Sequence, residues 1–203
     1  MTQHQLTPDL QLLAALGKQQ SFKKGTLIFS DGDNGDALFI VLEGRVRAYG
    51  SAISGKEITY GYVAAGEYFG EMTLDGGTRS ANVEAMEACL CAVVSNAQLE
   101  AFMQARPGFG TKMLHTVIAR ARQSTDNARN IALLDVYSRL KRAIERLTSE
   151  MTVAIGITHA ELAADVGASR EMVSKLLKDL EVGGYIKVQS RQLSRLKELP
   201  ERW

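Results

Sequence analysis

A group of polar side chains near the end of the chain has the types and spacing to bind a second polar surface. After Ser169, apolar residues recur at helical spacing and define one face of a helix: Val173, Leu176, Leu177 and Leu180. The opposite arc carries Glu171, Ser174, Lys175 and Lys178, with Arg170 in the first turn at its margin. Arginine can donate two hydrogen bonds to guanine, glutamate can accept from the amine of cytosine, and lysine can contact guanine or a phosphate. This chemistry suits a helix that reads base edges in double-stranded DNA.

The neighbouring elements favour the same interpretation. Thr158 and Glu161 form a capping box that begins a short helix, and Gly167 ends that helix. Ser169 can then cap the polar helix. Two short helices joined by a glycine-containing turn make a helix-turn-helix. After a pair of glycines, two extended stretches predict a β-wing: 185–188 and 193–196.

The first half of the chain has a different texture. From about Phe22 to Val94 glycine interrupts the sequence every few residues, and short apolar or alternating runs lie between the glycines. Many short strands with regular turn signals indicate an antiparallel roll or barrel. Before this region, a threonine cap followed by proline predicts a short helix from Thr7 to Lys18.

A long helix is expected between these two regions. Neither proline nor glycine occurs from 111 to 134, and apolar residues recur there at helical spacing. The apolar stripe suits a helix partner, although Arg120, Ser124 and Asn127 make its middle polar. A second helix is expected at about 136–148. The predicted class is therefore α+β, with three parts: an N-terminal antiparallel, jelly-roll-like β-roll (1–106), a connecting dimerisation helix (107–135) and a C-terminal winged helix-turn-helix (136–203).

Composition limits the remaining classes. The chain is 45% hydrophobic and 23% charged with a net charge of +1, and residues 139–203 hold 12 Lys and Arg against 9 Asp and Glu. No membrane-spanning stretch or signal-peptide core is present, so we expect a cytoplasmic protein without membrane contact. The only cysteines, Cys89 and Cys91, fall on one face of an apolar strand, which predicts buried packing and no metal site.

Two further stretches carry a family resemblance. The sequence from Gly70 through Glu71 and Met72 to Leu74, followed by Thr78-Arg79-Ser80-Ala81, resembles the phosphate-binding cassette of cyclic-nucleotide-binding domains. The order of cassette, long helix and winged helix-turn-helix resembles the cyclic AMP receptor protein family over almost the entire chain. The resemblance includes a hinge-like stretch at 134–136 and the recognition stretch at 167–171.

The resemblance implies roles for the cassette. Arg79, with Gly70 and the Ser80 hydroxyl, would bind the cyclic phosphate, and Glu71 would accept a hydrogen bond from the ribose 2′-hydroxyl. The alternative is that Glu71 and Arg79 form only a surface ion pair. Relatives place a Thr-Ser pair against the base across the dimer. Here the equivalent residues are Ser124 and Thr125, in reversed order.

The resemblance also implies a function. We expect a homodimeric DNA-binding regulator that is controlled by cyclic AMP and binds a palindrome resembling TGTGA, with half-sites about one helical turn apart. Cyclic di-GMP, or no ligand, remains the alternative. RNA polymerase is a further implied partner, although the segment 149–156 is shorter than the polymerase-contacting region of well-known relatives. A signalling module without DNA binding is disfavoured by the helix-turn-helix. An enzyme is disfavoured because no catalytic set of residues occurs.

Overall fold

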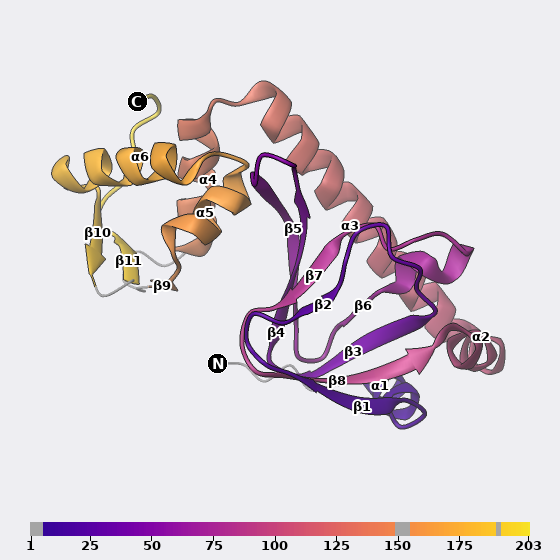
Figure 1. Cartoon of the computed structure of the whole chain (residues 1–203). Coiled ribbons are helices and arrows are strands. Elements are labelled where there is room, and N and C mark those ends of the chain that lie inside the picture. Colours follow the sequence, from indigo (N-terminus) through magenta and orange to yellow (C-terminus); the bar gives the residue numbers. More distant parts are fainter. Residues whose placement is uncertain (1–5, 149–154, 190–191) are drawn as a thin grey trace. The chain divides into compact units, whose positions relative to one another are not determined.

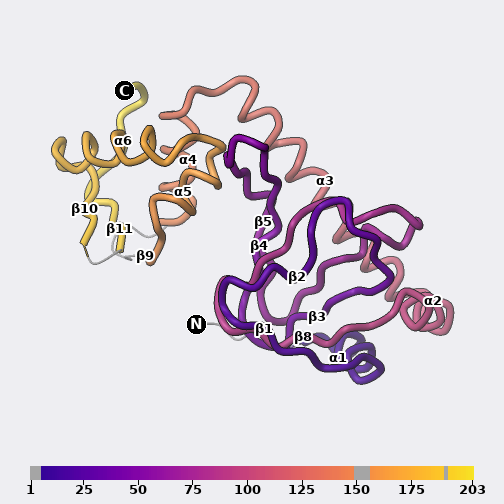
Figure 2. Tube along the Cα trace, in the orientation of Figure 1, coloured from indigo at the N-terminus to yellow at the C-terminus, as the bar shows by residue number. Residues whose placement is uncertain are grey.

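The computed structural model describes residues 6–148, 155–189 and 192–203. The chain divides into two compact units, one formed by 1–50 and 60–121 and the other by 51–59 and 122–203. The first unit is rich in strands and the second consists mainly of helices (Figures 1 and 2). The long helix α3 (Pro107–Leu133) contributes residues to both units.

Two four-stranded sheets form the β-roll. The strand order of the first sheet is β1 (Lys18–Phe22), β8 (Cys89–Ser95), β3 (Ala37–Glu43) and β6 (Tyr68–Phe69). The order of the second is β2 (Leu27–Phe29), β7 (Asn82–Ala85), β4 (Arg45–Ser51) and β5 (Glu57–Ala64). The pairings of β8 with β1 and β3, of β3 with β6, and of β7 with β2 and β4 are antiparallel. The predicted antiparallel roll is confirmed.

Strand β3 is buried on both faces. Leu38 and Ile40 face a core that also contains side chains of α1 (Pro8–Ala14), α2 (Asn96–Ala105) and the first turns of α3. Phe39 and Val41 point the other way, into the core that includes residues of both sheets. Successive side chains of a strand alternate between faces, so one continuous apolar run serves two cores.

Helix α1 begins as predicted and ends earlier. The Thr7 hydroxyl oxygen accepts a hydrogen bond from the Leu10 amide at 3.4 Å, which caps the helix. The predicted end at Lys18 is wrong, because Lys18 already begins β1. Gly17 lies against β8 so closely that an added Cβ would be 2.7 Å from the Val93 carbonyl oxygen, which brings the chain into the sheet at this point.

The two cysteines are buried on β8, as the alternation predicts. Cys89 and Cys91 are free thiols in the core between the sheets. Burial raises the pKa of both, and raises that of Cys91 to about 12. Among the described residues, no group of His, Cys, Asp and Glu is arranged to hold a metal ion.

The second unit contains the predicted helix-turn-helix and wing. Its helices are α4 (Val136–Leu147), α5 (His159–Val166) and α6 (Arg170–Val182), and its antiparallel sheet has the order β10 (Ile186–Gln189), β11 (Gln192–Arg195), β9 (Ile155–Gly156). Side chains from all three helices share one core, which includes Leu140, Ile144, Leu162, Leu177 and Leu180. Strand β9 adds an unpredicted third strand to the wing.

The junction between α3 and α4 lies at a capping residue. Helix α3 ends at Leu133, and the Asp135 carboxylate accepts a hydrogen bond from the Ser138 amide at 2.7 Å to begin α4. This donation lowers the pKa of Asp135. Neither α3 nor any other helix in the described part of the chain is long and apolar enough to cross a bilayer.

Candidate functional site

The cassette is a short 3-10 helix, η1 (Glu71–Asp75), between β6 and β7. Gly70 precedes it with φ of 89°, a left-handed conformation that favours glycine. An added Cβ at Gly70 would lie 2.7 Å from Arg79 Nη1 and 3.0 Å from the Ala37 carbonyl oxygen. Both backbone conformation and space therefore require glycine where the cassette meets Arg79.

Arg79 is the centre of this site and only 5% of its surface is exposed. Its Nη1 donates to the Gly70 carbonyl at 2.9 Å and its Nη2 to the Ala37 carbonyl at 3.0 Å. The guanidinium carbon lies 4.2 Å from the centroid of the Phe29 ring. Its buried Nε has no hydrogen-bond partner within the described structure. The guanidinium is thus fixed in place, and Nε is its one nitrogen without a hydrogen-bond partner in the described structure.

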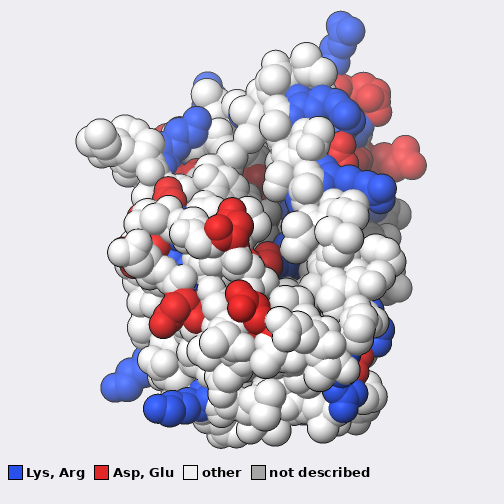
Figure 3. All heavy atoms as spheres, turned by 90° about the vertical axis from the view of Figure 1, so that its right-hand side faces the viewer, with Lys and Arg blue, Asp and Glu red and all other residues white. Residues whose placement is uncertain are grey.

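The electrostatics of Arg79 are those of a buried cation. Burial lowers its pKa, and the nearby carboxylates of Asp36, Asp33 and Glu71 oppose that shift. None of these carboxylates is within ion-pair distance of Arg79 in the described residues. The face of the molecule drawn in Figure 3 carries carboxylates among uncharged groups at its centre, and Lys and Arg mostly toward its margins. An anion that reaches Arg79 would meet a positive group that no carboxylate neutralises.

Glu71 forms an ion pair with the connecting helix, and the alternative Glu71–Arg79 surface pair is not formed. Arg120 Nη1 lies 2.7 Å from Glu71 Oε1, and Arg120 Nη2 donates to the Tyr68 carbonyl at 2.6 Å. The Glu71 side chain is 6% exposed and that of Arg120 is 32% exposed. Sequence reasoning placed Arg120 only as a polar interruption of the α3 stripe. The sequence signal that could have predicted this contact is the position of Arg120 within an apolar stripe, where an arginine needs a partner of opposite charge.

The other predicted nucleotide-binding residues are exposed. Met72 and Ser80, which directly follow the buried Glu71 and Arg79 in the sequence, are both exposed. Ser124 and Thr125 are exposed on α3 and belong to the second unit. The first unit therefore brings Gly70, Glu71 and Arg79 together without them.

The recognition helix α6 presents most of the predicted DNA-binding residues. The Ser169 hydroxyl oxygen accepts from the Met172 amide at 3.2 Å and caps the helix, two residues after Gly167 ends α5 with φ of 62°. Four predicted side chains are exposed: Arg170, Glu171, Lys175 and Lys178. The pKa of Glu171 is lowered, because its own backbone N–H and the Ser169 hydroxyl donate to its carboxylate. Glu171 is therefore ionised at neutral pH and can accept hydrogen bonds.

Ser174 differs from its neighbours. It is half-buried, and its hydroxyl lies 2.9 Å from Nδ1 of His159, the first residue of α5. This hydrogen bond links the start of α5 to the arc that was predicted to read DNA.

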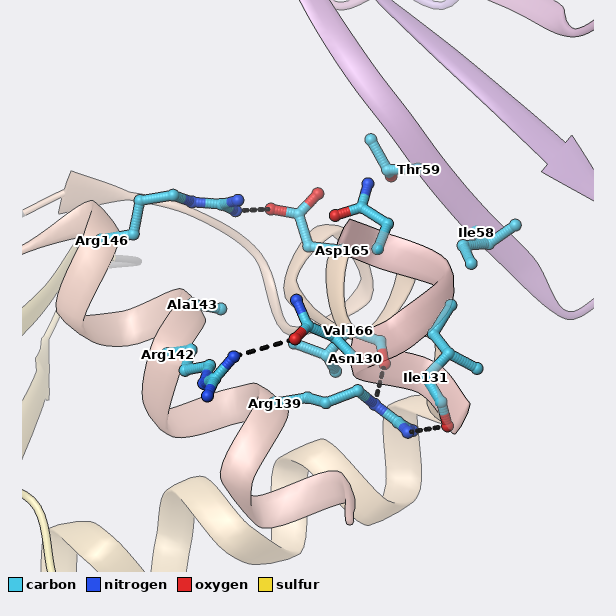
Figure 4. A pocket seen from close by; sticks show the side chains of 11 residues that line it. Ile58, Thr59, Asn130, Ile131, Arg139, Arg142, Ala143, Arg146, Asp165 and Val166 are labelled. Atoms are coloured by element: carbon cyan, nitrogen blue, oxygen red, sulfur yellow. Dashed lines mark hydrogen bonds and ion pairs between the residues drawn. The ribbon is translucent and has the colours of Figure 1, made fainter. Parts of the chain in front are cut away.

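A polar pocket of about 240 Å³ lies in the second unit (Figure 4). Its three arginines already have partners. Arg139 donates to the carbonyls of Ile131, Leu134 and Val166, which join the end of α3 to α4 and α5. Arg142 donates to Asn130 at 2.9 Å, and Arg146 lies 3.5 Å from Asp165. These contacts join α3, α4 and α5, the three helices that precede the recognition helix α6.

Comparisons with known proteins give a family match for each of the two regions described above, the β-roll with its cassette and the helix-turn-helix. Residues 19–106 match the family described as the cyclic nucleotide-binding domain, and residues 132–201 match the Crp-like helix-turn-helix domain. The cAMP-activated global transcriptional regulator Vfr of Pseudomonas aeruginosa is 30% identical over 203 residues, spanning 92% of this chain and 94% of that protein. The chain belongs to the cyclic AMP receptor protein family. It is accordingly a transcription regulator with a cyclic-nucleotide-binding domain and a DNA-binding helix-turn-helix, and members of this family are not enzymes.

Other members of the family are similar along their whole length. The cyclic AMP receptor protein of Thermus thermophilus is 29% identical, over 97% of this chain and 94% of that protein. Among solved structures, the c-di-GMP responsive global regulator CLP of Xanthomonas campestris has a TM-score of 0.84 and 25% identity, over 93% of this chain and 98% of that one. The predicted family and fold are confirmed, while these relatives differ in the ligand that their names state.

Proposed function

We propose that the chain is a homodimeric regulator whose binding to palindromic DNA is controlled by cyclic AMP held in the cassette. The observation that carries the proposal is the buried, fixed guanidinium of Arg79, whose Nε has no partner in the described structure. A buried polar donor without a partner is costly, so an acceptor from outside the chain is expected to bind there. A singly charged cyclic phosphate suits one guanidinium without a metal ion.

The rest of the ligand would lie along η1 and α3. Glu71, next to the phosphate position, would accept from the ribose 2′-hydroxyl through its remaining acceptor positions, since Arg120 Nη1 occupies one side of Oε1. The Ser80 hydroxyl would donate a hydrogen bond to the phosphate, and the exposed Met72 side chain would cover the bound nucleotide. Ser124 and Thr125 would contact the base. Because Arg120 belongs to α3, a ligand that changes the Glu71–Arg120 contact would also change the position of the connecting helix.

The surface of α3 supports a dimer. Leu114 is 57% exposed and Ile118, one turn later, is 40% exposed, so two large apolar side chains lie next to each other on the surface of α3. Packing them against the same helix of a second copy would bury them and would bring two recognition helices under one two-fold axis. Light scattering at micromolar concentration should give the mass of a dimer with and without cyclic AMP. A monomer under both conditions would contradict this part of the proposal.

DNA reading is assigned to the exposed arc of α6. Arg170 would donate to guanine and Glu171 would accept from cytosine in a TGTGA-like half-site, while Lys175 and Lys178 would contact guanine or phosphates. Contact with RNA polymerase stays a prediction, because residues 149–154 lie outside the described chain. A DNA-binding regulator of a bacterial family would act in the cytoplasm.

Calorimetry tests the ligand. The protein is titrated with cyclic AMP, cyclic GMP and cyclic di-GMP, beside the Arg79→Leu variant. We expect cyclic AMP to bind tightest and the variant to bind it more weakly. The second candidate ligand is cyclic di-GMP, which is favoured by the similarity to CLP. Preferential binding of cyclic di-GMP would show that it, and not cyclic AMP, is the ligand. Affinity that is unchanged in a folded Arg79→Leu protein would contradict the assignment of the cassette as the binding site.

A further inference from the structure

Ser174 occupies the middle of the recognition arc. It lies one helical turn after Arg170 and one turn before Lys178, so all three side chains project from the same side of α6. Arg170 and Lys178 are exposed, whereas Ser174 is half-buried against His159 of α5. The histidine therefore acts on the residue at the centre of the arc from a different helix.

The contact between His159 and Ser174 is not needed to hold the two helices together. The buried side chains of Leu162, Val166, Val173 and Leu177 already pack α5 against α6 in the core of this unit. His159 and Ser174 lie outside that core and are both half-buried. Their hydrogen bond can therefore act on the exposed side of the recognition helix without a role in the packing of the core.

The chemistry of the pair is directional. A neutral imidazole has one nitrogen that donates and one that accepts, and a serine hydroxyl has a single proton. When the Ser174 hydroxyl donates to His159 Nδ1, its proton is used and its lone pairs can only accept. The donors that the bases present in the major groove are the amines of adenine and cytosine. Guanine and thymine present acceptors there, guanine at O6 and N7 and thymine at O4. They could not form a hydrogen bond with a Ser174 hydroxyl that can only accept.

We propose that His159 is a positioning residue that fixes the polarity of Ser174, so that Ser174 accepts a hydrogen bond from an adenine or cytosine amine in each half-site. This inference rests on the proposed DNA reading by α6 and adds a base preference to it. His159 does not itself touch the base. It holds the Ser174 hydroxyl in one rotamer by accepting its hydrogen bond at Nδ1.

Selection of binding sites from random DNA tests the proposal with five proteins: the wild type, His159→Phe, Ser174→Ala, the double variant and His159→Asn. Phenylalanine keeps a ring of similar size but accepts no hydrogen bond. Asparagine can place its amide oxygen near the position of Nδ1. Thermal unfolding followed by circular dichroism checks that each variant is folded.

We expect the wild type to prefer adenine or cytosine at one position of each half-site. Ser174→Ala should reduce that preference about fivefold, the lower end of what a base contact provides. His159→Phe should reduce it similarly, because the freed hydroxyl can also donate to guanine or thymine. The double variant should match Ser174→Ala, since the two residues act as a unit. His159→Asn should retain the wild-type preference.

The outcomes separate the inference from the proposed function. A wild-type protein that selects no two-fold symmetric motif would contradict the assignment of α6 to DNA reading. A symmetric motif that His159→Phe leaves unchanged would overturn the role of His159 alone. A uniform loss of affinity for all sequences in His159→Phe, with the motif intact, would also overturn it, because a merely structural contact would act in that way.

Discussion

The ion pair between Glu71 and Arg120 should stabilise the β-roll unit by an amount that can be measured directly. Removing one partner of a buried ion pair costs about 3–5 kcal/mol, because it leaves an uncompensated charge. Arg120 is 32% exposed, so water can partly solvate a lone Glu71 carboxylate in its place. We therefore expect Arg120→Met to lower the free energy of unfolding by about 2–3 kcal/mol, below the fully buried range. Glu71→Gln should cost less, because the Arg120 guanidinium is then left facing water.

The assay is urea unfolding of the nucleotide-free protein followed by far-ultraviolet circular dichroism. The single tryptophan, Trp203, packs on Tyr137 and Tyr185 in the second unit, so its fluorescence would report the wrong part of the chain. The two single variants and the double variant form a cycle. Its coupling energy should be about 1.5–2 kcal/mol, in the range for a charge-assisted hydrogen bond.

A matched control lies on the same helix. Arg129 pairs with Asp126 at 3.1 Å, but both side chains are 63% exposed. Breaking such a surface pair typically costs under about 0.5 kcal/mol. Arg129→Met should therefore leave stability nearly unchanged. A Glu71–Arg120 coupling below about 0.5 kcal/mol, or an equal effect of Arg129→Met, would refute the reasoning that burial gives this pair its strength.

Three further predictions concern the ligand, the DNA and the core. Arg79→Leu should weaken cyclic AMP binding by about 2–3 kcal/mol in calorimetry, as expected for a lost charge-assisted hydrogen bond, and equal affinity in a folded variant would count against the phosphate site. Arg170→Ala should weaken binding to the cognate DNA site by about 1–3 kcal/mol and reduce the base preference at one position, whereas Lys178→Ala should weaken binding to all sequences similarly. Fluorescence anisotropy with matched and mutated duplexes distinguishes the two effects. Burial raises the pKa of Cys91 to about 12 and so favours its neutral form in the fold. This contribution to stability is complete below the ordinary thiol pKa of 9.0 and is lost as pH rises toward 12. Cys91 should accordingly resist thiol reagents at pH 8 until the protein unfolds, and rapid labelling of the native protein would contradict its burial.

Local patterns predicted the elements well. The capping box of Thr158 and Glu161 forms as expected, because its two hydrogen bonds join residues three apart. The short apolar runs between the glycines also predicted strands, and the run that contains Phe39 forms β3. Such features depend on neighbours in the sequence, which periodicity and capping rules describe.

The functional contacts were harder to predict. Glu71 and Arg120 are 49 positions apart, and His159 and Ser174 are 15 apart on different helices. Long side chains can meet many partners, and only the packing of α3 on the roll and of α5 on α6 selects these. The resemblance of the cassette predicted a phosphate and ribose site at Arg79 and Glu71, but not that Arg79 is held by the carbonyls of Gly70 and Ala37.

The central claim is that a cyclic nucleotide at Arg79 controls DNA binding, and one titration tests it most directly. A fluorescently labelled palindromic TGTGA duplex is titrated with the protein at constant salt, with and without cyclic AMP, in parallel for wild type and Arg79→Leu. We predict that cyclic AMP strengthens DNA binding by at least about tenfold in the wild type, or 1.4 kcal/mol of coupling, and has no effect on the variant. Equal wild-type affinity with and without cyclic AMP, or an equal response of the Arg79→Leu variant, would contradict the account.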